Sequence, residues 1–142
     1  MSDRLTIVRH GSGDDVLLEA AAARAPLYFR TGVHWSEADL LRQAAQLRAF
    51  LAQVPAPAGQ TRFALAFGVD DYRYLRLTFD VHPMGQVDVT VSMQDNFGDT
   101  ARPRFDRCTL HLDTDVASLD RFAAELAGIM ADEAPRAELA VR

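Results

Sequence analysis

The sequence contains no lysine, and all fifteen of its basic residues are arginine. Twenty acidic residues bring the formal net charge to −5 at pH 7. Because nucleic-acid affinity comes chiefly from neutralising phosphates, this balance argues against a nucleic-acid partner and favours a basic protein partner. The absence of lysine, together with the many alanines, indicates a GC-rich coding sequence more than it indicates a functional requirement for arginine.

Cysteine and long apolar runs are also scarce. Cys108 is the only cysteine, so no disulfide can form within the chain and nothing indicates an oxidising compartment. The longest apolar runs fall far short of the roughly 20 residues that a membrane span needs, and residues 1–15 lack a signal-peptide core. We therefore expect a cytoplasmic protein with no membrane partner.

The chain has 142 residues, of which 49% are hydrophobic and 25% charged. This composition is typical of a globular protein, and the length suits one hydrophobic core of ordinary size but not two. We expect a single α+β domain over residues 1–142. Residues 136–142 follow a proline, show no strong pattern and are expected to be frayed.

The chain is expected to open with a β-hairpin. Leu5 to Arg9 form a short β-branched segment, and a turn rich in glycine and aspartate follows over residues 11–15. The next arm, Val16 to Ala23, stays open between strand and helix because its alanine run also suits a helix. Residues 27–33 are expected to form another strand.

Two helices are predicted from apolar residues at a spacing of about 3.6. The first starts at Ser36, with Asp39 three residues later in the capping-box position. Asp115 or Ser118 is expected to cap the second. The apolar faces consist of Leu40, Leu41, Ala44, Leu47, Phe50, Leu51 and Val54 in the first helix and Leu119, Phe122, Ala123, Leu126, Ile129 and Met130 in the second.

Between the helices the hydrophobic period changes to two, which predicts antiparallel strands. Alternate residues from Phe63 to Val69, Leu75 to Val81 and Val87 to Met93 are the expected buried sets. A shift of one residue in the pairing would expose the apolar side chains of one strand to water. The numbers of two residues that pair between the second and third strands must therefore add up to an even number. A three-residue loop over 83–85, with Gly85 in the left-handed position, meets this condition.

After a loop over residues 94–106, Cys108, Leu110 and Leu112 alternate in one more strand. Each helix and strand has one apolar side, and these sides are buried most simply when both helices pack on one face of an antiparallel sheet. We expect a meander of about five to seven strands with two main α-helices. The other face of the sheet then meets solvent or a partner.

The pairing predicted around the loop over residues 83–85 places Asp80 opposite Asp88. Two close carboxylates can raise one pKa and support acid–base catalysis. Arg62 falls opposite Asp80 if the preceding strand pairs through a three-residue turn, so we interpret the row as ordinary cross-strand charge pairing. We expect no catalytic residue here.

The remaining polar patterns do not define a metal or cofactor site. His111, Asp113 and Asp115 alternate at a strand end, which we interpret as solvated side chains because no HExxH, HxH or CxxC frame accompanies them. The sequence also lacks a GxSxG elbow, a P-loop and a GxGxxG turn. We expect no metal and no cofactor.

The order of elements resembles the WapI-type immunity proteins, which protect bacteria from their own polymorphic toxins. The resemblance covers most of the chain from Trp35 to Met130. It rests on a helix rhythm, a G-x-V-x-V strand and a closing helix, formed here by Leu40, Leu41, Leu47 and Leu51, by Gly85 to Val89, and by Leu119, Phe122 and Leu126. It implies a small cytoplasmic protein that binds a toxin domain and blocks it without catalysis.

The sequence thus predicts a non-catalytic protein-binding module, and an acidic domain suits a basic partner because charge complementarity speeds encounter. A small-molecule-binding protein or enzyme with a site built from His34, Asp80 and His111 is one alternative. A homodimer formed through an exposed sheet face or edge is another. The expected partner-binding residues are Asp70, Asp71, Arg76, Asp80, Asp88 and His111.

Overall fold

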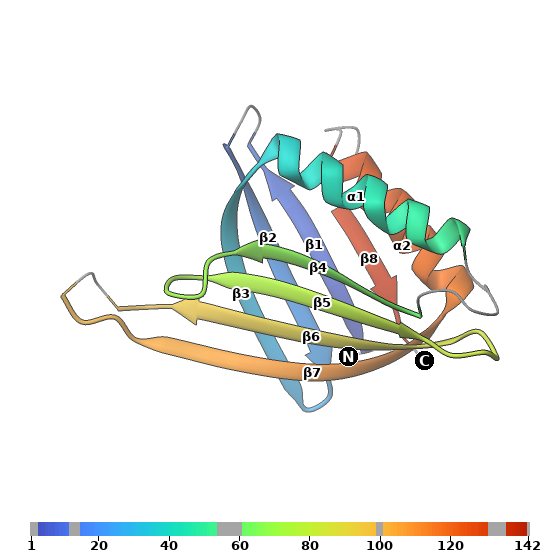
Figure 1. Ribbon diagram of the computed structural model, residues 1–142. Coiled ribbons are helices and arrows are strands. Elements are labelled where there is room, and N and C mark those ends of the chain that lie inside the picture. The colour runs from blue at the N-terminus through green and yellow to red at the C-terminus, as the bar shows by residue number, and fades with distance from the viewer. Residues whose placement is uncertain (1–2, 12–14, 54–60, 99–100, 131–135, 142) are drawn as a thin grey trace.

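The computed structural model describes residues 3–11, 15–53, 61–98, 101–130 and 136–141. Within these ranges the chain forms an α+β fold with two helices among antiparallel strands (Figure 1). The elements in chain order are β1 (Arg4–His10), β2 (Asp15–Arg24), β3 (Leu27–Ser36), α1 (Glu37–Ala52), β4 (Arg62–Gly68), β5 (Tyr74–Val81), β6 (Gln86–Asn96), β7 (Phe105–Asp115), α2 (Val116–Met130) and β8 (Arg136–Ala140).

The strands form two sheets, where the sequence predicted one. Sheet A has the order β3-β2-β1-β8 and sheet B the order β4-β5-β6-β7. The antiparallel pairing and the α+β class are confirmed. The single sheet is wrong because a period of two says which side of a strand is buried but not which strands become neighbours.

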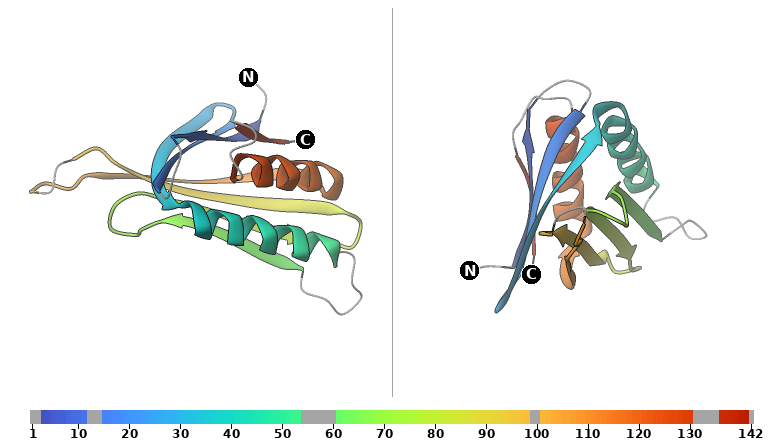
Figure 2. Two further views of the ribbon diagram at one scale, coloured as in Figure 1. Left: turned by 90° about the horizontal axis from the view of Figure 1, so that it is seen from above. Right: turned by 90° about the vertical axis from the view of Figure 1, so that its left-hand side faces the viewer.

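The two sheets cross and then diverge, and the helices occupy the space between them (Figure 2). β3 packs across β4, β5 and β6, and β2 contacts β7. On the open side α1 and α2 pack against each other, α1 also against β3 and β4, and α2 also against β1, β8, β6 and β7. Both helices therefore lie on the inner face of sheet B, as the one-sided patterns predicted.

One hydrophobic core fills this space. Its members include Leu47, Phe79, Val89, Leu110 and Phe122, which come from both helices and from sheet B. The predicted helix faces are largely confirmed, although Leu41 is 42% exposed and lies outside the buried stripe. Val54 and the side chain of Met130 lie outside the described residues.

The predicted frayed tail is wrong, because β8 pairs along its whole length with β1. Ala137 and Leu139 are fully buried beside the inner face of α2. A five-residue strand with only two inward side chains leaves too short a pattern to stand out in the sequence. The segment Val16–Ala23, which the sequence left open, lies within β2, where Ala20 and Ala22 face the core.

Side chains bond to the backbone at one free edge of each sheet, β4 in sheet B and β8 in sheet A. The amide of Gln43 in α1 accepts a hydrogen bond from the Ala66 N–H at 2.9 Å and donates to the Ala66 carbonyl at 2.7 Å, so it takes the place of a strand beside β4. At β8 the Glu125 carboxylate accepts from the Glu138 N–H. Covered edges pair poorly with other chains, so β4 and β8 are unfavourable sites for strand addition.

Both helix starts follow the predicted capping. The Ser36 hydroxyl accepts from the Asp39 N–H, and the Asp115 carboxylate accepts from the Ser118 N–H. Burial would raise the pKa of Asp39, but hydrogen bonds from Arg42, Gln43 and Trp35 outweigh it and hold that pKa below its usual value. Asp39 therefore anchors the first turn of α1 as a carboxylate.

Arg9 joins β1 to both helices. Its side chain is 2% exposed, donates to the Ile129 carbonyl at 3.1 Å near the end of α2, and forms a 2.6 Å ion pair with Glu37 at the start of α1. A cation is favourable at a helix C-terminus and an anion at an N-terminus, so Arg9 suits the end of α2 and Glu37 suits the start of α1. This contact therefore ties the start of α1 and the end of α2 to β1.

We predict that Arg9→Met lowers the free energy of unfolding by roughly 1–3 kcal/mol, because it leaves a buried carbonyl without its donor. Glu37→Gln is the matched control, since its amide oxygen still accepts a hydrogen bond and its site is partly exposed. Urea denaturation followed by circular dichroism measures both. A loss for Glu37→Gln as large as that for Arg9→Met would contradict the assigned role of the Ile129 contact.

The turn between β5 and β6 has the predicted form. The His82 N–H donates to the Gln86 carbonyl at 2.8 Å, Gly85 has a φ of 83°, and Asp80 pairs with Asp88. The Gly85 carbonyl also accepts from the Val116 N–H at 3.1 Å, so the turn contacts the start of α2.

Gly85→Val should destabilise the domain by roughly 1–3 kcal/mol, because a β-branched residue tolerates positive φ poorly. No heavy atom lies within 4 Å of a Cβ placed at Gly85, so backbone strain alone sets the cost. Gly85→Asn should cost less, since asparagine adopts this conformation more readily. Equal unfolding midpoints for the two variants would show that φ is not the constraint.

Candidate functional site

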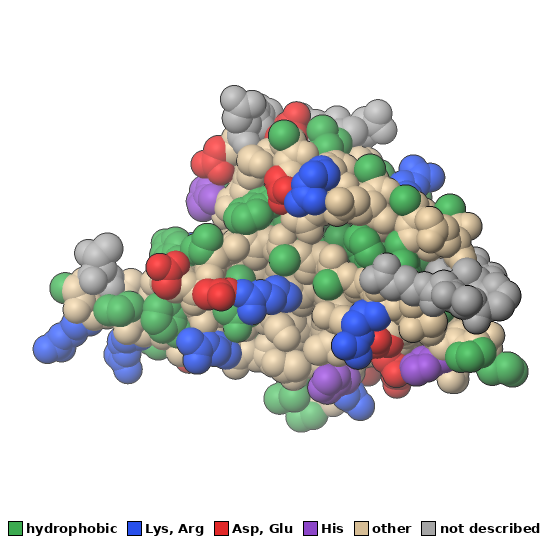
Figure 3. Space-filling view, in the orientation of Figure 1, with side chains coloured by type: hydrophobic (Ala, Val, Ile, Leu, Met, Phe, Trp, Pro, Cys, Tyr) green, Lys and Arg blue, Asp and Glu red, His purple; other side chains and the backbone are tan. Residues whose placement is uncertain are grey.

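The outer face of sheet B is the surface that the helices leave uncovered, and it faces the viewer in Figure 3. Strand alternation generates it, because each inward apolar residue is followed by an outward one. We call this surface the outer face. It consists of Arg62, Ala64 and Ala66 in β4, Tyr74, Arg76, Thr78 and Asp80 in β5, Gln86, Asp88, Thr90 and Ser92 in β6, and Arg107, Thr109, His111 and Asp113 in β7.

One end of the outer face carries three aspartates in a single cross-strand row. Asp80 pairs with Asp88, and Asp88 pairs with Asp113 on the next strand. Arg62 completes the row on β4. We call these four residues the acidic row. Like charges directly opposite each other on neighbouring strands are destabilising, so the row holds its aspartates against their mutual repulsion.

The acidic row is only partly neutralised. Arg62 Nε donates to Asp80 Oδ1 at 2.6 Å, and this hydrogen bond raises the pKa of Arg62. His82 Nε2 lies 2.6 Å from Asp88 Oδ2. Asp113 has no ion-pair partner among the described residues, so negative charge is left exposed there.

A depression of about 300 Å³ lies beside Asp88 and Asp113. Gln86, Val87 and Thr114 complete its lining. Its mouth therefore carries two carboxylates that face each other across β6 and β7. Such a depression can accept the cationic end of an arginine or lysine side chain.

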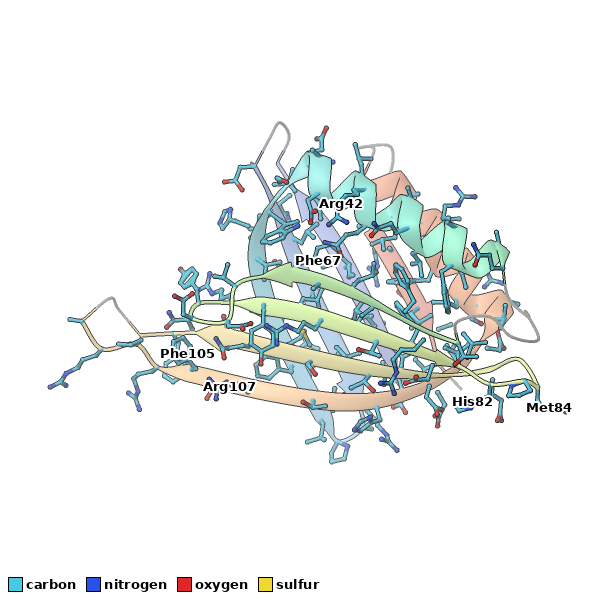
Figure 4. The ribbon with its side chains drawn as sticks, viewed as in Figure 1. Arg42, Phe67, His82, Met84, Phe105 and Arg107 are labelled. Carbon is cyan, nitrogen blue, oxygen red and sulfur yellow. The ribbon has the colours of Figure 1, made fainter. Side chains whose placement is uncertain are left out.

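The opposite end of the outer face carries arginines stacked on aromatic rings. Within the described residues four such pairs lie in this region: Arg73 on Tyr72, Arg76 on Tyr74, Arg104 on Phe97 and Arg107 on Phe105. These pairs occur roughly once per 70–80 residues in proteins, so four at one end of a 142-residue chain form a distinct cluster. Figure 4 shows Phe105 and Arg107 at this end and His82 and Met84 at the other.

Gln94 holds this end together. It is fully buried, and its amide nitrogen donates at 2.9 Å to the carbonyls of both Asp70 and Tyr72, which fixes the turn between β4 and β5. Its amide oxygen accepts from Arg107 Nε at 2.6 Å. Arg107 is thus oriented from below by Gln94 and on one side by the Phe105 ring.

The ends of β6 and β7 extend beyond the rest of sheet B as a projecting hairpin (Figure 1). Residues 95–96 and 105–106 pair only with each other, since the pairing of β5 with β6 ends at Gln94. The predicted loop over residues 94–106 is therefore too long, because three of these four strand residues are polar and they form no apolar period. Phe97 at the tip is 54% exposed.

The predicted binding residues are spread along the outer face. Asp80 and Asp88 lie together in the acidic row, and His111 lies one row away beside Thr90. The other three, Asp70, Asp71 and Arg76, lie toward the arginine end, where Asp70 forms an ion pair with Arg76. The structure thus places them at two separate points.

The sequence-based set of candidate binding residues did not include Asp113 and Arg107. Asp113 enters the acidic row only through the register between β6 and β7, and Arg107 enters the other end through Phe105 and Gln94. The alternation of His111, Asp113 and Asp115 did indicate that these side chains share one face. Their neighbours on β6 could not be read from that alternation alone.

The residues proposed for an enzyme site are not gathered at one point. His34 lies on β3 of sheet A beside Asp15, whereas Asp80 and His111 lie in different rows of sheet B. In the part of the chain that the structure describes, no three His, Cys, Asp or Glu side chains are grouped to hold a metal ion. Burial raises the pKa of the Cys108 thiol.

Comparison with models of known protein families gave no match, and no curated protein matched the chain. No helix among the described residues is long and apolar enough to cross a membrane.

Proposed function

We propose that this domain is a non-catalytic binding module that attaches to the basic surface of another protein through the outer face. The acidic row is its main contact, and the depression beside Asp88 and Asp113 receives an arginine or lysine side chain of the partner. In the role that the WapI-type resemblance implies, the partner is a toxin domain that the bound module covers.

The observation that carries this proposal is the row of three aspartates in register. A sheet that served only stability would gain by alternating charges along this row, because opposite charges across strands stabilise and like charges do not. Asp113 opposite Asp88 instead leaves exposed negative charge. A cationic partner group at this point would remove the repulsion on binding.

The geometry also favours arginine as the inserted group. Two carboxylates on directly opposed strand residues lie about 5 Å apart at their Cβ atoms, which suits a planar guanidinium with donors on two edges. His82, whose Nε2 lies 2.6 Å from Asp88 Oδ2, is the nearest competing hydrogen-bond partner. Because it is half-exposed, it can turn away when a partner arrives.

An immunity protein that acts by binding needs a rigid contact surface and does not need a reactive group. The outer face lies on strands whose inner sides are packed in the core, so its charges are held at fixed spacing. Fixed charges lose little conformational entropy on binding. The overall charge of −5 adds long-range attraction toward a basic toxin.

The test uses a nine-residue arginine peptide as the basic probe and isothermal titration calorimetry at low salt. The double variant Asp88→Asn with Asp113→Asn should weaken binding roughly tenfold, which corresponds to about 1.4 kcal/mol. The matched control is Asp106→Asn with Asp120→Asn, two exposed aspartates outside the acidic row that change the net charge equally.

The control should leave the affinity within about twofold, as expected for distant exposed charges. Equal losses for the two double variants would mean that the peptide responds to net charge and not to the acidic row. No binding by the unsubstituted protein would also contradict the proposal.

A further inference from the structure

In the part of the chain that the structure describes, the two ends of the outer face carry opposite charges without ion-pair partners. Among the described residues, neither Arg104 nor Arg107 has a carboxylate within ion-pair distance, and Asp113 has no cation. Arg107 and Asp113 lie on the same side of the same strand, β7. The face is therefore electrostatically asymmetric along the strand direction.

This asymmetry is complementary to a copy of itself. Arg107 and Asp113 are six residues apart, a separation of about 20 Å along an extended strand. A two-fold axis that lies in the face, crosses the strands at right angles and passes between Thr109 and His111 places each Arg107 over the Asp113 of the other copy. Symmetry produces this ion pair twice, as in any isologous interface.

The middle of the outer face permits close approach. The two rows between the charged ends consist mostly of short side chains, as the broad uncharged area in Figure 3 shows. Their members are Ala66, Arg76, Ser92 and Thr109 in one row and Ala64, Thr78, Thr90 and His111 in the next. The long side chain in these rows, Arg76, forms an ion pair with Asp70 and contacts the Tyr74 ring.

Arg107 is prepared for this contact. Its Nε is bound by Gln94 at 2.6 Å and its guanidinium lies over the Phe105 ring, so the side chain is already oriented. Bidentate binding to a carboxylate uses donors in the plane of the guanidinium. Preorganised groups lose less entropy on association.

The size of the face sets the expected strength. Four strands about 4.8 Å apart and about eight residues long, at about 3.4 Å per residue, give an area of roughly 500 Å². Two copies would bury roughly 1,000 Å², which lies at the low end of specific interfaces and suits a weak, reversible dimer.

We propose that a second copy of this chain binds face to face on the outer face, with Arg107 of each copy seated in the depression between Asp88 and Asp113 of the other. The dimer covers the acidic row. A basic partner and a second copy therefore compete for one surface, and the partner must dissociate the dimer. The dimer itself does not depend on the proposed function.

Sedimentation equilibrium over a range of protein concentrations tests this arrangement by charge reversal. Arg107→Asp and Asp113→Arg should each weaken self-association at least tenfold. An equimolar mixture of the two variants should dimerise again, because each Arg107–Asp113 contact is restored with opposite or original sign. The double variant carrying both changes should also dimerise. Arg48→Asp, on the exposed side of α1, is the control and should leave self-association unchanged.

A purely monomeric unsubstituted protein, or a mixture in which no dimer returns, would overturn the proposal. Circular dichroism melting of each variant shows whether a loss reflects unfolding. The arginine-peptide titration separates the two ideas: Arg107→Asp keeps the acidic row, so it should bind the peptide although it no longer dimerises. A dimer that forms while no variant binds the peptide would reject the proposed function alone.

Discussion

The buried guanidinium of Arg9 is the contact on which the arrangement of the layers depends. It links β1 of sheet A to the start of α1 through Glu37 and to the end of α2 through the Ile129 carbonyl. The helices in turn separate the two sheets where these diverge and contact both of them. One side chain that is 2% exposed therefore helps to set the angle between the sheets.

The outer face follows from that packing. Both helices and sheet A contact the inner side of sheet B, and Gln43 covers the edge of β4. The outward residues are thus left to meet solvent or another molecule. Because residues alternate along a strand, the buried inner sets also determine where the outer charges stand. The spacing between the acidic row and Arg107 is a consequence of the core.

Sequence reasoning reached the local structure but not the arrangement of the sheets. The alternation of apolar residues in β5 and β6, together with Gly85, was enough to predict the turn and the pairing of Asp80 with Asp88. The same alternation is compatible with many registers between β6 and β7, because no tight turn joins these strands. The sequence therefore could not predict which residue of β6 lies opposite Asp113. β8 was not predicted from the sequence because its apolar side consists of only two residues, Ala137 and Leu139. Long-range pairing is decided by tertiary packing, which one-dimensional periodicity does not contain.

We propose that partners approach the outer face at its acidic row. The most direct test is a heteronuclear NMR titration with the nine-residue arginine peptide, read at each backbone amide. We expect shift changes concentrated in residues 86–90 and 111–115, with little change in sheet A. Changes concentrated in sheet A or along the exposed sides of the helices would contradict it.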